Sequence, residues 1–153
     1  MSASGATPVV SVSRPMSRLS AYAILVKPDV TFLVILTTLA GFYLGATGPI
    51  DALRMFNAVF GTTLVAAGTA ALNQYIERAS DAKMRRTSAR PLPLGALRPI
   101  EAFMFGAALI VLGASYLALL TNWLACALAL LTTALYLGVY TPLKQRTTLA
   151  TAI

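Results

Sequence analysis

The sequence predicts an all-α protein, a polytopic bundle of transmembrane helices, and two observations carry this prediction. Hydrophobic residues make up 58% of the 153 residues and charged residues only 11%, whereas a soluble domain carries about 25% charged residues. The charges also leave three long uncharged stretches, of 21, 22 and 42 residues, at positions 30–50, 55–76 and 102–143. Because one span requires about 20 residues, we expect four spans, two of them in the longest stretch.

The expected elements follow in order along the chain. Residues 1–20 are rich in serine and contain no acidic residue, which predicts a disordered cytoplasmic tail. Residues 21–153 form the membrane domain, with spans expected at four positions: residues 30–48, 55–76, 101–120 and 123–141. Pro28 suits the first turn of the first span, and residues 121–122 supply a tight turn before the last. The apolar residues after Arg146 are expected to begin a fifth span, so we interpret the chain as the N-terminal portion of a longer domain.

Small residues predict where helices approach one another closely. Gly41 and Gly45 have the GxxxG spacing that allows two helix backbones to come into contact. We expect this pair to serve packing within one bundle, ahead of the alternative of a dimer interface. The second span is rich in glycine, alanine and threonine, which suits a helix surrounded by other helices.

The distribution of cations predicts the topology. Of the twelve Lys and Arg residues, only Arg54 falls on one side of the expected spans. Since cytoplasmic loops carry the excess of Lys and Arg, the termini and the loop of residues 73–95 are expected in the cytoplasm. The net charge of +7 therefore reflects topology, and no nucleic-acid-binding motif accompanies it. The short tail without a convincing transit peptide favours a bacterial inner membrane, with the mitochondrial inner membrane as the alternative.

Three polar residues share one face of the helix that ends the second span. Asn73, Glu77 and Asp81 are four residues apart, so an α-helix stacks them with a rise of about 6 Å between neighbours. Two carboxylates and an amide oxygen suit Mg²⁺, whose coordination is usually completed by substrate phosphates. Cations suited to phosphate follow in the loop: Lys83, Arg85, Arg86 and Arg90. The competing interpretation is an ordinary solvated loop whose cations fix the topology.

The segment NQYIERASDAKMRRTSARPLPLG, residues 73–95, closely resembles the first acidic motif of the UbiA superfamily of intramembrane prenyltransferases. Three steps within it are most similar to the protoheme IX farnesyltransferases, or heme O synthases: Met84, Arg86-Thr87 and Arg90-Pro91-Leu92. Two further segments are similar to this branch, Lys27-Pro28 before the first span and YTPLKQRT at residues 140–147. The resemblance covers residues 22–153 in collinear order.

This resemblance implies a nine-helix membrane fold, of which four spans are present, and a Mg²⁺-dependent transfer of a farnesyl group from farnesyl diphosphate to a vinyl group of heme b. It implies that Asn73, Glu77 and Asp81 hold the metal. Catalysis is then expected to rest on four residues: Glu77, Asp81, Arg86 and Arg90. Diphosphate binding is expected from a larger set: Lys83, Arg86, Arg90, Tyr140 and Lys144. For the last two, an interfacial anchor and a topology charge are equal alternatives.

The sequence departs from the family pattern at several places. Glu77 stands where the family usually has Asp, and Ala79 stands where it often has another Asp. Asp29 occupies a position that is usually basic. The family is also longer and carries a second acidic motif in its later half, so a missing C-terminal half is an expected partner of this chain.

Two other functions stay open at this point. A 4-hydroxybenzoate polyprenyltransferase of the same superfamily is one, since these relatives carry a polar residue at the position of Gln74, although they lack the YTPLK segment. The other is a truncated, inactive four-helix membrane protein or half of a split enzyme. The isolated chain of 153 residues is expected to be inactive.

Overall fold

The computed structural model describes residues 16–146, with side chains as far as residue 144. This part of the chain is entirely helical: α1 (Arg18–Leu25), α2 (Pro28–Gly45), α3 (Ala52–Asp81), α4 (Pro99–Leu120), α5 (Trp123–Leu135), the π-helix η1 (Tyr136–Tyr140) and α6 (Thr141–Arg146). Most of the expected tail and the expected start of a fifth span lie outside the described residues.

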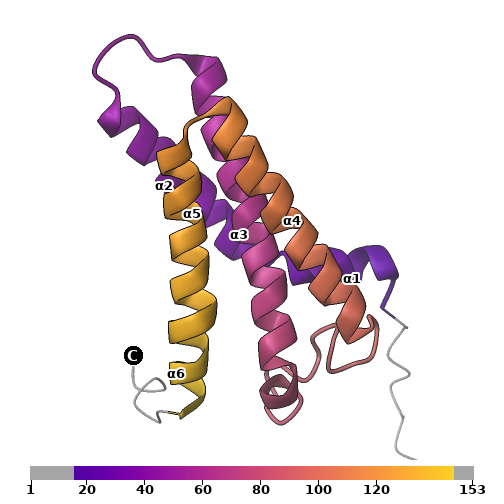
Figure 1. The fold of residues 1–153 in the computed structure, drawn as a ribbon. Helices are drawn as coiled ribbons and strands as arrows, with labels where there is room; N and C mark the ends of the chain where they lie inside the picture. Colours follow the sequence, from indigo (N-terminus) through magenta and orange to yellow (C-terminus); the bar gives the residue numbers. More distant parts are fainter. Residues whose placement is uncertain (1–15, 147–153) are drawn as a thin grey trace, which may run out of the picture.

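Four helical stretches are long and apolar enough to cross a membrane: Pro28–Gly45, Ala52–Asp81, Pro99–Leu120 and Trp123–Lys144. This confirms the predicted all-α class with four spans. The loop between α2 and α3 and the turn between α4 and α5 lie at one end of the bundle, and the loop between α3 and α4 lies at the other (Figure 1). The long loop and α6 therefore share an end.

Helix α1 was not anticipated, because its first residues fall inside the range expected to be a disordered tail. The Oγ of Ser17 caps it by accepting a hydrogen bond from the amide of Ser20 at 3.2 Å. Its Ala21 and Leu25 are fully buried in a cluster with residues of α3, of α4 and of the loop between them. Burial of these two apolar side chains is the force that holds so short a helix in place.

Helices α3 and α4 form the tightest contact in the described chain, and glycines make it possible. A Cβ placed on Gly68 would lie 2.6 Å from the carbonyl oxygen of Gly106, and one on Gly113 would lie 2.9 Å from that of Gly61. The backbones meet because these positions carry no side chain. Twelve of the 30 residues of α3 are buried, and they are spread from Asn57 to Asp81, which agrees with the prediction of a helix surrounded by other helices.

The prediction of close packing at Gly41 and Gly45 is wrong for the described part of the chain. A Cβ at either position would meet nothing within 4 Å, and no residue of α2 is buried. The spacing of the two glycines is necessary for a close contact, but a neighbouring helix must also face them.

The loop between α3 and α4 is compact, although the sequence alone allowed it to be a solvated segment. Thr87, Leu92 and Leu97 are buried, and Gly95 makes the required turn with a φ of +70°. The amide of Arg98 donates to the Glu101 carboxylate at 2.9 Å, which caps the start of α4. This folding of the loop brings its middle portion back against the end of α3.

Candidate active site

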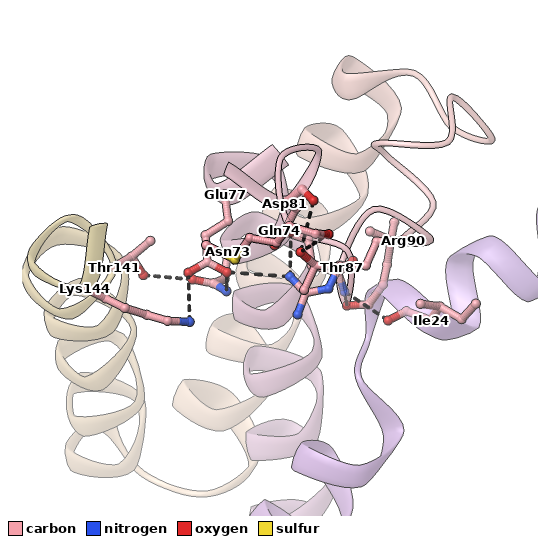
Figure 2. A network of polar contacts seen from close by, with 11 residues as sticks. Ile24, Asn73, Gln74, Glu77, Asp81, Thr87, Arg90, Thr141 and Lys144 are labelled. Atoms are coloured by element: carbon pink, nitrogen blue, oxygen red, sulfur yellow. Dashed lines mark hydrogen bonds and ion pairs between the residues drawn. The ribbon is translucent and has the colours of Figure 1, made fainter. Parts of the chain in front are cut away.

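The last two turns of α3 present a row of buried polar side chains at the end of the bundle where the long loop lies. Asn73, Glu77 and Asp81 are only 2%, 6% and 4% exposed. They lie on one face of the helix and point toward α6 and the loop (Figure 2). Two buried carboxylates this close together require compensating positive charge.

Two cations from distant parts of the chain supply that charge. Arg90, in the loop, places its Nη1 2.5 Å from Asp81 Oδ2 and 3.7 Å from Glu77 Oε2. Lys144, in α6, places its Nζ 3.4 Å from Glu77 Oε1. The structure thus brings five predicted residues together: Asn73, Glu77, Asp81, Arg90 and Lys144 (Figure 2).

Thr141 completes the row and was missed by the sequence analysis. Its hydroxyl is fully buried and donates to Asn73 Oδ1 at 2.8 Å, while Asn73 Nδ2 donates to Glu77 Oε2 at 3.0 Å. The same hydroxyl lies 2.9 Å from the carbonyl oxygen of Tyr136, in the wide π-turn. A threonine next to the matched Tyr140 position was the available signal, but its direction depends on the π-turn that precedes it.

Four other predicted residues do not reach the row. Lys83, Arg85 and Arg86 are exposed, and none of them forms an ion pair within the described part of the chain. Tyr140 is 52% exposed and stacks on Tyr136 with ring centroids 5.3 Å apart. These residues flank the row without contacting its carboxylates.

Two neutral side chains, Gln74 and Thr87, connect the end of α3 to neighbouring segments by hydrogen bonds. Gln74 Nε2 donates to the carbonyl oxygens of Ile24 and Leu25, both at 3.0 Å, which fastens the end of α1 to α3. Thr87 donates through Oγ1 to the carbonyl oxygen of Asp81 at 3.0 Å, which fastens the loop to the end of α3. These three bonds give additional donors to carbonyl groups at the ends of α1 and α3.

Lys27 is a third cation near the row, and its place in the sequence indicated no role there. It joins α1 to α2 in a left-handed conformation with a φ of 48°, and its side chain is half-buried. Burial, followed by repulsion from Arg90, lowers the pKa of Lys27 below its usual range. Lys27 forms no ion pair with Glu77 or Asp81 within the described residues, so it adds positive charge near the row without contacting it.

An apolar cavity of about 240 Å³ opens beside this charged row, between α2, α3 and α5. Lys27 lies at one part of its lining, and the other lining residues are mostly aliphatic or small: Val30, Val34, Thr62, Val65, Ala66, Thr69, Ala70, Ala129, Thr132, Thr133 and Tyr136. Ala70 lies one helical turn before Asn73, so the cavity ends close to the charged row. Thr69 and Thr133 share a hydrogen bond of 2.9 Å in its wall.

The donor set fits a magnesium ion that is shared with a phosphate ligand. Within the described residues no cluster of three or more His, Cys, Asp or Glu side chains exists. The side chains of this part of the chain therefore do not complete the coordination of a metal ion by themselves. Magnesium is commonly held by one or two carboxylates, with waters and substrate phosphates completing six positions. Glu77 and Asp81 provide two carboxylates, whereas the amide oxygen of Asn73 is engaged by Thr141.

Comparison with known proteins gives this arrangement a family. The model of the UbiA prenyltransferase family matches residues 34–153. The chain belongs to the UbiA prenyltransferase family. The resemblance inferred from the acidic motif is therefore confirmed, and no solved structure matches the chain.

Individual UbiA relatives are similar over most of the chain. A protein of Koribacter versatilis is 42% identical over 98% of the chain and 50% of its own length. Proteins of Solibacter usitatus and Aquifex aeolicus are 41% and 39% identical, each over 86% of the chain. All three are named protoheme IX farnesyltransferase. The chain spans about half the length of the curated UbiA relatives it matches.

Proposed function

We propose that this chain contributes the first acidic motif of a heme O synthase, which transfers a farnesyl group from farnesyl diphosphate to a vinyl group of heme b. The observation that carries the proposal is the buried Glu77–Asp81 pair, which faces Arg90 and Lys144 beside an apolar cavity. The names of the relatives support this substrate pair over 4-hydroxybenzoate. Membership of the family supports prenyl transfer as the reaction class.

In this proposal the diphosphate group lies over the charged row, with Mg²⁺ held by Glu77 and Asp81, and by Asn73 once its amide oxygen is released from Thr141. Magnesium, when bound, supplies Lewis-acid neutralisation of the charge that grows on the departing pyrophosphate. Arg90 and Lys144 bind the same oxygens directly, because guanidinium and ammonium groups pair strongly with phosphate. Breaking the allylic carbon–oxygen bond is thereby made easier.

The flanking residues have subsidiary roles in this proposal. Lys83 and Arg86 lie on the exposed side of the loop, where their charge raises the local concentration of an anionic substrate. Tyr140 lies at the edge of the row, and its exposed ring is available to the substrate. The prenyl chain lies in the apolar cavity, which excludes water from the allylic cation.

The test is heme analysis of a bacterium that makes heme b but lacks its own heme O synthase and receives the complete protein. We expect heme O to appear, and Asp81→Asn to lower it at least about a hundredfold, because neutralising the leaving group is worth several kcal/mol. Asp51→Asn is the matched control. Asp51 caps the other end of α3, and asparagine caps equally well.

Failure of the complete protein to make heme O would sink the proposal. Prenylated 4-hydroxybenzoate in the same cells would establish the alternative substrate. Equal heme O levels in the two variants would remove Asp81 from the site.

A further inference from the structure

The Arg90 guanidinium lies where a cation bridging the two carboxylates would lie. One nitrogen, Nη1, is 2.5 Å from Asp81 Oδ2 and 3.7 Å from Glu77 Oε2. The carboxylate side chains are only 6% and 8% exposed, and that of Arg90 is 26% exposed. A single positive group therefore lies against both buried negative groups, which follow one another along α3.

A divalent cation bound to Asp81 Oδ2 and Glu77 Oε2 would occupy the position that the Arg90 guanidinium fills. Two positive groups competing for these two oxygens repel each other strongly in a site with little water. A metal would therefore bind both oxygens only after the guanidinium had moved away.

The remaining contacts of the row allow that displacement. Glu77 keeps two other partners, Lys144 on Oε1 and Asn73 on Oε2. Within the described residues the Arg90 side chain has no polar partner besides the two carboxylates. Its backbone amide is held separately by the carbonyl oxygen of Thr87 at 3.0 Å. The long side chain is therefore able to swing away while the loop stays in place.

We propose that Arg90 is a resting counter-ion of the acidic row, which the divalent cation displaces and which then binds the phosphate ligand that arrives with the metal. This inference rests on the proposed function and specifies the order of events at that site. A displaced guanidinium has its full set of donors available for an anion. Metal and anion thus bind cooperatively, since each improves the position of the other.

The first test measures Mn²⁺ binding by electron paramagnetic resonance in the purified protein, without phosphate. Arg90→Gln removes the competing charge and should tighten Mn²⁺ binding by about tenfold or more. Arg85→Gln is the matched control, because Arg85 is exposed in the same loop and forms no ion pair in the described chain. Its dissociation constant should stay within about twofold of the unaltered protein.

The second test uses the unaltered protein, so it decides the question even where Arg90→Gln fails to fold. Phenylglyoxal modifies accessible arginines, and mass spectrometry reports the rate at each position. Adding Mg²⁺ should raise the modification rate of Arg90 several-fold while that of Arg85 stays constant.

Mn²⁺ binding that is unchanged or weaker in Arg90→Gln overturns the inference, as does an Arg90 modification rate that Mg²⁺ leaves unchanged or lowers. Those results leave the metal site and the proposed function intact. No Mn²⁺ binding in either protein, with or without added inorganic pyrophosphate, would overturn the metal site, and the inference together with the proposed function.

Discussion

At the residue scale, the site is a chain of hydrogen bonds and ion pairs in which each side chain orients the next. Thr141 donates to Asn73, Asn73 donates to Glu77, and Lys144 and Arg90 hold the carboxylates from either side. These bonds orient the Asn73 side-chain amide, because its Oδ1 accepts from Thr141 and its Nδ2 donates to Glu77. The threonine hydroxyl therefore decides which way the amide oxygen points.

Thr141→Val tests this orientation, because valine keeps the shape of threonine and loses the donor. The variant leaves the buried Asn73 Oδ1 without its partner, which should lower the free energy of unfolding by about 1–3 kcal/mol. Thr141→Ser keeps the hydroxyl and is expected to recover most of that loss. Thermal unfolding of the purified variants in detergent micelles gives the comparison, and equal melting temperatures for valine and serine would contradict the assigned role.

At the element scale, glycines decide which helices make contact. Gly68 and Gly106 let the backbones of α3 and α4 touch, whereas Gly41 in α2 faces open space within the described chain. The π-helical turn η1, between α5 and α6, contains one more residue than an α-helical turn. Lys144 and Thr141 follow it and meet α3 at the charged row (Figure 2). Close packing and this single wide turn together set the position of the site.

Gly68→Ala should be costly, because its Cβ would lie 2.6 Å from a backbone oxygen that has no room to yield. Overpacking of this kind costs about 1–3 kcal/mol or more. Gly41→Ala makes the same chemical change where nothing lies within 4 Å and should not destabilise the protein. Chemical unfolding of both variants measures the difference, and a destabilised Gly41→Ala would show that α2 is covered at that position.

At the scale of the whole molecule, the charged row and the cations of the loop between α3 and α4 lie at one end of the described bundle. The loop between α2 and α3 lies at the opposite end (Figure 1), and Arg54 follows it in the first turn of α3. The positive-inside rule favours an orientation in which the site lies at the cytoplasmic face of the membrane. We propose this orientation for the protein.

Thiol labelling measures the orientation directly. Cys126 is the one cysteine in the 153 residues, so within this chain Cys126→Ser leaves only an introduced thiol. Gly48→Cys, between α2 and α3, should react with a membrane-impermeant reagent in intact spheroplasts. Ser88→Cys, in the loop after α3, should react only after the membrane is opened, and the reverse pattern would invert the topology.

The sequence by itself determined the features that depend on local spacing. The uncharged stretches predicted four membrane-spanning helices, and the structure confirms them. The spacing of four residues predicted that Asn73, Glu77 and Asp81 share one face of a helix, and they do so on α3. Both follow from the fixed pitch of an α-helix. The acidic motif likewise identified the family, because its residues are contiguous in the chain.

Only the tertiary structure decided which cations serve the row. Arg90 reaches the carboxylates and Arg86 does not, because the folded loop turns one of them inward. Thr141 and Lys27 join the site from segments far away in the sequence. Their positions depend on the π-turn and on α1, which is held by burial against α3 and α4. Contacts between distant segments are determined by tertiary packing, so the local spacing of residues in the sequence does not predict them.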